Sequence, residues 1–383
     1  MTNPAPPAPT SVLVLGAGFG GLELCTRLAE ELGSAVEITL VDRSDAFIFG
    51  FSKFDVMFQK KPLDAVRMRY AEMTNPRVRF RQETITAIDP VARRVTTGEA
   101  SYAADIMVVA LGADYDVEAT PGLATAGYEF YSVPGAVRLR ETLPGFTGGT
   151  AVIGVCGPSF KCPPAPSEAA FLLDEYLRER DRRANTQIRL VMPFGAPVPP
   201  SPETSAAILE RFKALDIEFV PNRRVTALEN GAALLDDGTR LPYDLFLGVP
   251  VHRVPDVVAA SGMTENGWIP VNPQTLATRF PGVYAVGDVT SVGTPKAGVF
   301  AEGAARVVAD QLVARVRGEN IPPGYDGTGA CYIEFGGEAV ARVDVDFFST
   351  PGRPTGTFTS PSPMTAAEKV AFGTTRRARW FGS

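Results

Sequence analysis

The chain has 383 residues, of which 45% are hydrophobic and 21% are charged, and its formal net charge is −6. This length fits two or three domains at roughly 150 residues each, and the balance of apolar and charged residues excludes a wholly disordered chain. An acidic chain lacks the basic footprint of nucleic-acid recognition, so no nucleic-acid partner is expected. No run of about 18 apolar residues occurs, so no segment is expected to span a bilayer.

The N-terminal sequence, MTNPAPPAPTSVLVLGAG, has no basic residue before its apolar run, which passes directly into a glycine loop. It predicts a proline-rich leader and a first strand rather than a secretory signal, and therefore a cytoplasmic protein. The four cysteines, Cys25, Cys156, Cys162 and Cys331, are too few for a framework of structural disulfides. Any pair among them is expected to be catalytic.

The first elements have the form of a dinucleotide-binding unit. Ser11–Leu15 predicts a buried strand, 22–32 a helix, and 37–41 a second strand that ends in an acid. The intervening loop, GAGFGG, provides a tight turn, room for a pyrophosphate and close packing of helix on strand. The helix N-terminus is expected to bind the phosphates and the acid a ribose. The expected contacts are Gly16, Gly18, Phe19, Gly20, Gly21, Asp42 and Arg43.

Two later segments favour FAD over NAD at this first site. Residues 106–112, IMVVALG, form a strand that enters a turn of small residues. Residues 282–288, GVYAVGD, form a strand that ends in Gly-Asp ahead of a helix expected at about 301–313. A carboxylate at a strand end suits a ribityl hydroxyl, and a helix N-terminus suits the electron-rich edge of a flavin. Together with GAGFGG, these segments resemble the flavoproteins that have two dinucleotide-binding domains, and the resemblance adds Ala110, Gly112, Gly287 and Asp288 to the expected FAD site.

An internal repeat predicts the fold class. Residues 85–113 and 225–251 share the order strand, turn, strand, acid and apolar strand. Two copies of one supersecondary unit indicate an α/β protein with two Rossmann-like dinucleotide-binding domains and a small C-terminal segment. The expected division is a FAD-binding domain at 1–119 and 246–320, a second domain at 120–245 and a C-terminal region at 321–383.

The second domain departs from the dinucleotide pattern after its first strand, 150–155. Cys156 replaces the middle glycine, Pro158 stiffens the turn, and the next parallel strand, IRLVM, has no terminal acid. The usual residues for NAD(P)H are therefore missing. Cys25 is interpreted as a core residue and Cys156 as a packing residue at a strand end, the alternative being that Cys156 is a resolving thiol for Cys162.

Cys162 is the expected reactive thiol of this loop. It stands next to Lys161 and about one turn ahead of a helix expected from Ser167 to about Arg180, and both features favour the thiolate. Prolines on both sides hold the segment extended. The alternative is that Cys162 is a small buried apolar residue.

The segment FKCPPAPSE, 160–168, resembles the redox-cysteine motif of sulfide:quinone oxidoreductases and of the flavoprotein subunit of flavocytochrome c sulfide dehydrogenase. These are FAD-dependent members of the pyridine nucleotide-disulfide oxidoreductases. ACYIEFGG, 330–337, is similar to the segment with their second cysteine, and PKAGVFAE, 295–302, to a turn near their isoalloxazine. The similarity covers about residues 11–345.

The resemblance implies that Cys162 and Cys331 form a redox pair on one face of the flavin. Sulfide or a related sulfur compound is then oxidised through a persulfide, and the electrons pass through FAD to a quinone or a cytochrome. Glu168 is expected to transfer protons. The alternative is that Glu168 is only an acid at the N-terminus of a helix, where the helix dipole favours a negative charge. Lys296 is expected to stabilise reduced flavin, the alternative being a solvated lysine.

Three positions depart from the family pattern. Tyr131 lies in the segment where many quinone-linked members have a third cysteine. Residues 47–51 lack the cysteine that tethers FAD in the flavocytochrome branch, so FAD is expected to be non-covalent. Many quinone-linked members also have histidines near the sulfur site, whereas the single histidine of this chain, His252, lies in a different strand-end segment. It is interpreted as structural. The alternatives are therefore a type II NADH:quinone oxidoreductase, a ferredoxin-reductase-like flavoprotein, or a flavin-binding partner protein without turnover. No metal site is predicted.

The C-terminal end predicts a helix that starts with a capping box at 365–368. Its basic residues, Lys369, Arg376, Arg377 and Arg379, are followed by Trp380 and Phe381. A basic, aromatic end suits peripheral binding to the inner face of the cell membrane. The alternative is a tail that docks on the protein.

Overall fold

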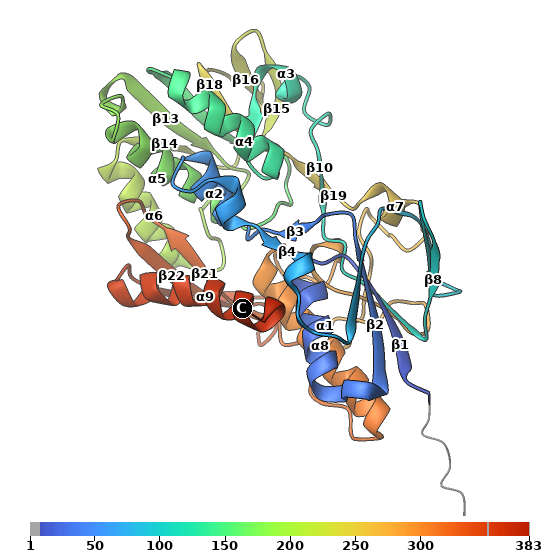
Figure 1. Ribbon diagram of the computed structural model, residues 1–383. Helices are drawn as coiled ribbons and strands as arrows, with labels where there is room; N and C mark the ends of the chain where they lie inside the picture. The colour runs from blue at the N-terminus through green and yellow to red at the C-terminus, as the bar shows by residue number, and fades with distance from the viewer. Residues whose placement is uncertain (1–7, 351, 383) are drawn as a thin grey trace, which may run out of the picture.

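The first domain is built on a five-stranded parallel sheet in the order β20-β9-β1-β2-β5. The computed structural model describes residues 8–350 and 352–382, so most of the predicted leader lies outside the described residues. Helices α1 (Phe19–Leu32) and α8 (Gly298–Arg317) pack side by side against this sheet (Figure 1). The strands are β1 (Thr10–Leu15), β2 (Val36–Asp42), β5 (Val78–Gln82), β9 (Ile106–Val109) and β20 (Val283–Ala285).

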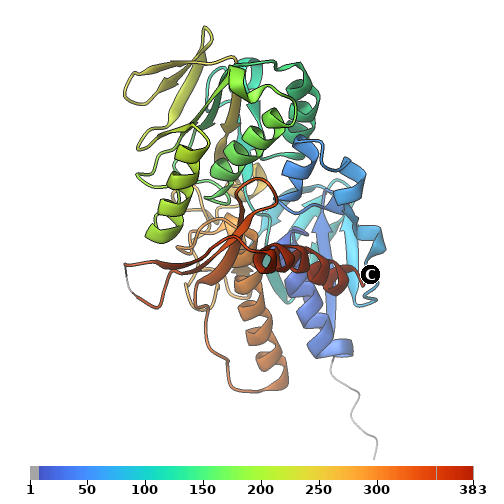
Figure 2. The same ribbon diagram turned by 90° about the vertical axis from the view of Figure 1, so that its left-hand side faces the viewer.

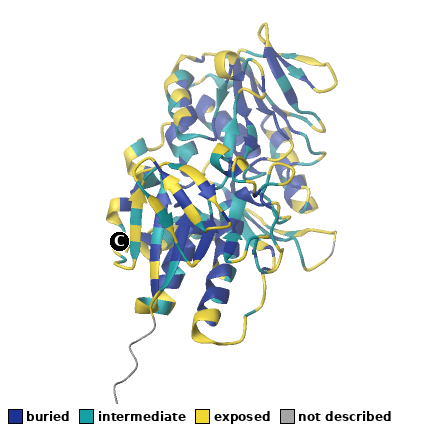
Figure 3. Cartoon of the chain, turned by 90° about the vertical axis from the view of Figure 1, so that its right-hand side faces the viewer, coloured by how far each residue is buried: buried dark blue, intermediate teal, exposed yellow. Residues whose placement is uncertain are grey.

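The second domain repeats this plan with a parallel sheet in the order β11-β18-β12-β13-β14. Its strands are β11 (Tyr128–Glu129), β12 (Gly149–Val155), β13 (Thr186–Val191), β14 (Ile217–Val220) and β18 (Leu245–Val249). Its helices are α4 (Val133–Thr142), α5 (Ala165–Arg178) and α6 (Pro202–Ala214). The expected boundary at residue 245 falls on the first residue of β18, which belongs to the second sheet. In both domains the central strands are buried (Figure 3).

The predicted internal repeat is confirmed by two antiparallel three-stranded sheets. Both have a register irregularity at the same place in their first strand, between Ile85 and Ala87 in one and between Val225 and Ala227 in the other. The strands are β6 (Ile85–Asp89), β7 (Arg94–Thr97) and β8 (Ser101–Ala103), and β15 (Val225–Glu229), β16 (Ala232–Leu235) and β17 (Arg240–Pro242). Shared topology and a shared irregularity support two copies of one unit.

The chain passes between the two domains through β10 (Asp114–Asp116) and β19 (Val251–Arg253), which pair antiparallel (Figure 1). The shorter elements are α2 (Ser52–Met57), α3 (Leu123–Ala126), α7 (Asp256–Ala259), β3 (Ala46–Phe47) and β4 (Met68–Arg69). The paired crossing places the loop that follows β12 against the first domain, because Cys162 donates its backbone N–H to Lys296 O.

The C-terminal region consists of an antiparallel sheet, β21 (Thr328–Glu334), β22 (Val340–Asp346) and β23 (Thr355–Thr359), and helix α9 (Pro363–Phe381). The sheet packs on the second domain, since Phe335 stacks on Phe171 of α5 at 5.2 Å between ring centroids. Helix α9 runs across the front of the molecule toward α1 (Figure 2). None of the helices that the structure describes is both long and apolar enough to cross a bilayer.

Two predicted helix starts differ from the structure. Helix α5 begins at Ala165, with Pro164 as its N-cap, and Ser167 is buried inside the first turn. Proline is accepted there because the first helical N–H groups have no intrahelical partner. Helix α9 is capped by Ser362, and Thr365 closes the capping box from its third position instead of beginning it.

The basic tail is docked on the protein. Trp380 is 3% exposed, and its indole N–H donates to Glu23 on α1 at 2.9 Å. Burial opposes ionisation of Glu23, but hydrogen bonds from Trp380, Arg306 and Arg379 outweigh it and hold the pKa of this carboxyl below its usual value. Arg376 pairs with the buried Glu302 of α8, and Lys369 with Glu334 of β21. Among the described residues, only Arg377 of the tail's four cations forms no ion pair. The tail therefore docks on the protein, which was the alternative to membrane binding.

Candidate active site

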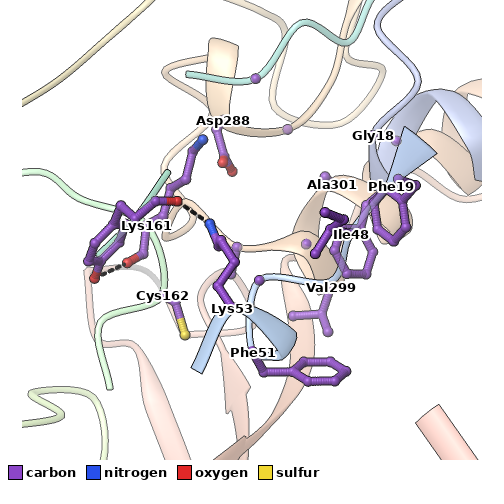
Figure 4. A pocket seen from close by; sticks show the side chains of 18 of the residues that line it. Gly18, Phe19, Ile48, Phe51, Lys53, Lys161, Cys162, Asp288, Val299 and Ala301 are labelled. Atoms are coloured by element: carbon purple, nitrogen blue, oxygen red, sulfur yellow. Dashed lines mark hydrogen bonds between the residues drawn. The ribbon is translucent and has the colours of Figure 1, made fainter. Parts of the chain in front are cut away.

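A cavity of about 440 Å³ lies between the two domains and the C-terminal region (Figure 4). It is lined from the first domain, from the β12–α5 loop, from β21 and from α9. The cavity brings together these predicted residues: Gly16, Gly18, Phe19, Gly20, Asp42, Ala110, Gly112, Gly287, Asp288, Cys162, Glu168 and Cys331. Three others, Gly21, Arg43 and Lys296, are not among its lining residues.

The glycine loop has the geometry of a dinucleotide cradle. Gly16 has a φ of 99°, and a Cβ there would collide with Ala110 O. A Cβ on Gly18 would meet nothing within 4 Å, so this position leaves the cavity open. A Cβ on Gly21 would collide with Gly16 O, which explains why a residue outside the cavity must still be glycine. The loop is thus compact and its cavity side is free for a phosphate.

Charge and backbone at the cradle fit FAD. Helices α1 and α8 both begin at the cavity, and neither has an acid in its first turn or a side-chain cap. Their N-terminal amides can therefore face an anion or an electron-rich ring edge. Asp42 accepts hydrogen bonds from the N–H groups of Ala17 and Ser44, both at 2.7 Å, which fix its carboxylate at the end of β2.

Arg43 and Lys296 occupy other places than expected. Arg43 is exposed and pairs with Asp114 at 3.2 Å. The Lys296 ammonium donates to Asp288 O at 2.6 Å and lies 3.2 Å from the Trp268 ring centroid. Burial lowers the pKa of Lys296 to about 8. The Lys296 ammonium therefore stabilises the turn at residues 288–290, and Lys296 does not line the cavity.

The two cysteines of the predicted pair line the same cavity as the cradle, and both are free cysteines. Cys162 has a φ of 50°, a left-handed conformation that is uncommon outside glycine. Its N–H donates to Lys296 O at 2.7 Å, and its C=O accepts from Ala165 N–H at 2.8 Å. These bonds hold a strained backbone, which is typical of functional sites. Cys331 enters from the middle of β21.

The expected stabilisation of a Cys162 thiolate by Lys161 is wrong. The Lys161 ammonium donates to Ala113 O at 2.6 Å and to the Tyr115 hydroxyl at 3.3 Å. Burial raises the pKa of the Cys162 thiol well above its usual value, and negative charge on Glu168 and Cys331 adds to the rise. Burial also raises the pKa of Cys331 to about 12. Loss of solvation therefore sets the direction of both pKa shifts, and the Lys161 ammonium is directed elsewhere.

Glu168 is a buried acid within the same cavity. Its Oε1 accepts a hydrogen bond from the Glu334 N–H at 3.0 Å. Burial raises the pKa of Glu168 to about 7, against the lowering effect of the Lys369 ammonium. A carboxyl that titrates near neutrality suits proton transfer.

A hydrogen-bonded cluster behind Cys162 was not predicted. The Tyr131 hydroxyl donates to Lys161 O at 2.9 Å, and His252 Nε2 accepts from the Lys161 N–H at 3.2 Å. Burial lowers the pKa of His252 to about 3, and its Nδ1 lies 2.8 Å from Pro250 O. His252 is thus neutral and structural, as interpreted from the sequence. Lys53 of α2 also lines the cavity; no sequence pattern distinguishes it from a surface lysine.

The second domain does not repeat the cradle. Pro164 and Pro166 stand at the start of α5 and have no N–H, and Glu168 puts a carboxylate in its first turn. Phe160 stacks on Phe194 at 5.8 Å between ring centroids, after the ends of β12 and β13. Cys156 is buried in the core of this domain, where a packing residue is expected, and burial raises its pKa to about 12. Cys25 is buried in the core beside α1.

A dinucleotide cradle that opens on two cysteines and a buried acid defines a flavin-dependent oxidoreductase with two dinucleotide-binding domains, and its cofactor is FAD. Residues 10–306 match the family model described as pyridine nucleotide-disulphide oxidoreductase. The chain belongs to this family.

Several proteins that resemble the chain carry the names of quinone-linked oxidoreductases. The mitochondrial sulfide:quinone oxidoreductase of Mus musculus is 24% identical over 89% of this chain and 79% of that protein. Demethylphylloquinone reductase NdbB of Synechocystis is 26% identical over 72% of this chain and 71% of that protein. The crystal structure of the sulfide:quinone oxidoreductase of Aquifex aeolicus has a TM-score of 0.83 at 20% identity, covering 97% of this chain and 92% of that chain. The structural likeness confirms the fold.

Proposed function

We propose that the protein oxidises sulfide through Cys162 and Cys331 and transfers the electrons to a quinone. One observation carries the proposal: both cysteines and Glu168 line the cavity that contains the dinucleotide cradle. The similarity to enzymes named sulfide:quinone oxidoreductase supports the choice of substrate and acceptor. FAD, held non-covalently by the cradle, supplies a two-electron carrier between sulfur and quinone.

The sulfur step uses the cysteine pair in its disulfide form. Hydrosulfide attacks one cysteine sulfur, a new S–S bond gives a persulfide, and the bond between the cysteines breaks. The second cysteine leaves as a thiolate, and bound FAD would supply the two-electron oxidant that takes its electron pair before the disulfide closes again. Glu168 takes the proton of the persulfide, whose terminal sulfur leaves at the oxidation level of elemental sulfur as the disulfide closes again. Hydrosulfide thus loses two electrons and one proton, and the quinone gains two electrons and two protons, one of them from solvent.

An apolar part of the cavity suits a quinone ring. Ile48, Phe51, Val299 and Phe372 line it, and the first three lie together on the side of the cavity away from Asp288 (Figure 4). Aromatic and branched aliphatic side chains bind a planar apolar ring and exclude water. Because the basic residues of α9 are engaged on the protein, we propose that peripheral membrane contact is made by apolar residues on the outer face of this helix, where Met364 and Val370 are 71% and 66% exposed.

Anaerobic rapid mixing tests the function. Sulfide is expected to bleach the flavin absorbance at about 450 nm, and NADH is not, because the β12–α5 loop lacks phosphate-binding amides. Cys162→Ser and Cys331→Ser are each expected to slow sulfide bleaching by a factor on the order of 10³ while FAD content stays normal. Fast reduction by NADH with no reaction of sulfide would instead establish the type II NADH:quinone oxidoreductase, a function consistent with the 36% identity to an NADH dehydrogenase-like protein of Mycobacterium tuberculosis over 37% of this chain.

A further inference from the structure

Lys53 brings a positive charge into the cavity beside Cys162. It lies on α2, and its side chain projects between Cys162 and Asp288 (Figure 4). Its ammonium donates to Tyr131 O and, within the described residues, forms no ion pair. An ammonium has three donors, so further donor capacity remains at the cavity.

The other lysines around the cavity are committed elsewhere. Lys161 points to Ala113 O and the Tyr115 hydroxyl, and Lys296 points to Asp288 O beneath the turn. Lys369 lines the cavity from α9 but is paired with Glu334. The charge of Lys53 is therefore the one available to a ligand at Cys162.

The surroundings of Cys162 are otherwise unfavourable to an anion. Glu168 and Cys331 both act on Cys162 as negative neighbours, and their effect is to raise its pKa. Lys53 is the cation that acts on the pKa of Cys162 in the opposite sense, against the larger effect of burial. Without Lys53, a negatively charged sulfur donor would approach Cys162 in a desolvated site beside the carboxylate of Glu168.

We propose that Lys53 is a specificity-determining residue that binds a compact anionic sulfur donor beside Cys162 and so selects hydrosulfide over neutral or cationic thiols. The proposal deepens the proposed function and rests on it for the identity of the donor. The selectivity arises from geometry: Lys53 lines the same cavity as Cys162, and the Tyr131 carbonyl holds its ammonium in place without an ion pair among the described residues.

Two alkylating reagents test this selectivity without turnover. Iodoacetate and iodoacetamide both form a C–S bond with a cysteine thiolate and release iodide, but only iodoacetate is an anion. The ratio of their rate constants therefore cancels the fraction of thiolate and reports the local charge that the reagent meets. The experiment uses the FAD-loaded, reduced Cys331→Ser protein, in which Cys162 is followed by mass spectrometry and Cys25 and Cys156 are buried.

Lys53→Met is expected to lower the iodoacetate-to-iodoacetamide ratio at Cys162 about tenfold, the effect of a charge contact of one pKa unit. Lys53→Arg retains the charge and is expected to retain the ratio. Lys61→Met is the matched control, because Lys61 follows α2 but is exposed and paired with Asp55. It is expected to leave the ratio unchanged.

An unchanged ratio in Lys53→Met, with normal FAD content, overturns the proposal. An equal fall in Lys53→Arg and Lys53→Met also overturns it, since packing rather than charge would then be responsible. The result is separate from the proposed function: if sulfide fails to bleach the flavin while the ratio falls as expected, the anion site stands and the identity of its donor is wrong.

Discussion

Each parallel sheet has a turn that leads from a central strand into a helix, from β1 into α1 in one domain and from β12 into α5 in the other. The two turns differ in the chemical groups that they present at the edge of the sheet. After β1 the chain enters α1 through glycines, with free amides and no acid in the first turn. After β12 it enters α5 through prolines, with Cys162 in a left-handed conformation and Glu168 buried in the first turn. The position after the first strand of a Rossmann-like unit places backbone at the edge of the sheet, where ligands bind. Residue type then decides whether that edge binds phosphate or presents a thiol.

Residues of both turns line the same cavity. The β12–α5 turn is bonded to the first domain through Cys162 N–H and Lys296 O, so the thiol faces the first cradle instead of its own. Cys331 arrives from β21, more than 160 positions along the chain from Cys162. The second domain thus acts on a cofactor that the first domain binds.

Breaking the first turn has the largest expected effect. Gly21→Ala places a Cβ against Gly16 O and forces α1 away from the loop, so we expect loss of bound FAD. Flavin absorbance relative to protein measures it. Gly145→Ala is the control, because a Cβ there meets nothing within 4 Å. Full FAD content in Gly21→Ala would show that the loop is not the cradle.

Removing the acid of the second turn has the next largest effect. Burial raises the pKa of Glu168 to about 7, so the carboxylate that accepts a proton forms as pH rises through about 7. Sulfide-dependent flavin reduction is expected to rise over this range and level off above it. Glu168→Gln is expected to lower the rate about 10²-fold and to leave only the pH dependence that comes from ionisation of hydrogen sulfide itself, whereas Glu179→Gln, at the exposed end of α5, leaves the rate and its pH dependence as in the parent protein.

The same acid affects stability in the opposite direction. The pKa of Glu168 is raised in the folded protein, so its contribution to stability is present at low pH and is lost as pH rises through about 7. The thermal midpoint is expected to fall with pH over this range in the parent protein and to fall less in Glu168→Gln. Equal pH dependence of the two midpoints would contradict a titration of Glu168 near neutrality.

The smallest expected effect concerns the support of Cys162. Tyr131→Phe removes the hydrogen bond to Lys161 O, worth about 1 kcal/mol, and frees the strained turn. We expect sulfide-dependent flavin reduction to slow about fivefold with normal FAD content, because the cradle is untouched. Tyr243→Phe removes a similar bond to Ala126 O in the second domain and is the control. Equal effects of the two variants would argue against positioning by Tyr131.

The sequence by itself determined the class of fold, the cradle and the residues of the candidate sulfur site. Glycines, strand-end acids and the Lys-Cys-Pro-Pro segment act over a few neighbouring positions, so their spacing along the chain is enough to predict what they form. The repeat of strands was likewise visible, because alternating apolar and turn residues repeat in order.

Only the tertiary structure decided where long side chains point and which distant charges meet. Lys161 was expected to act on Cys162, and Lys296 and Arg43 on the flavin, but each finds its partner elsewhere, while Lys53 lines the cavity that contains the thiol. The basic tail docks because two acids buried in α1 and α8, Glu23 and Glu302, accept its arginines. A lysine or arginine reaches several ångströms in many directions, and the packing of segments far apart in sequence selects one of them.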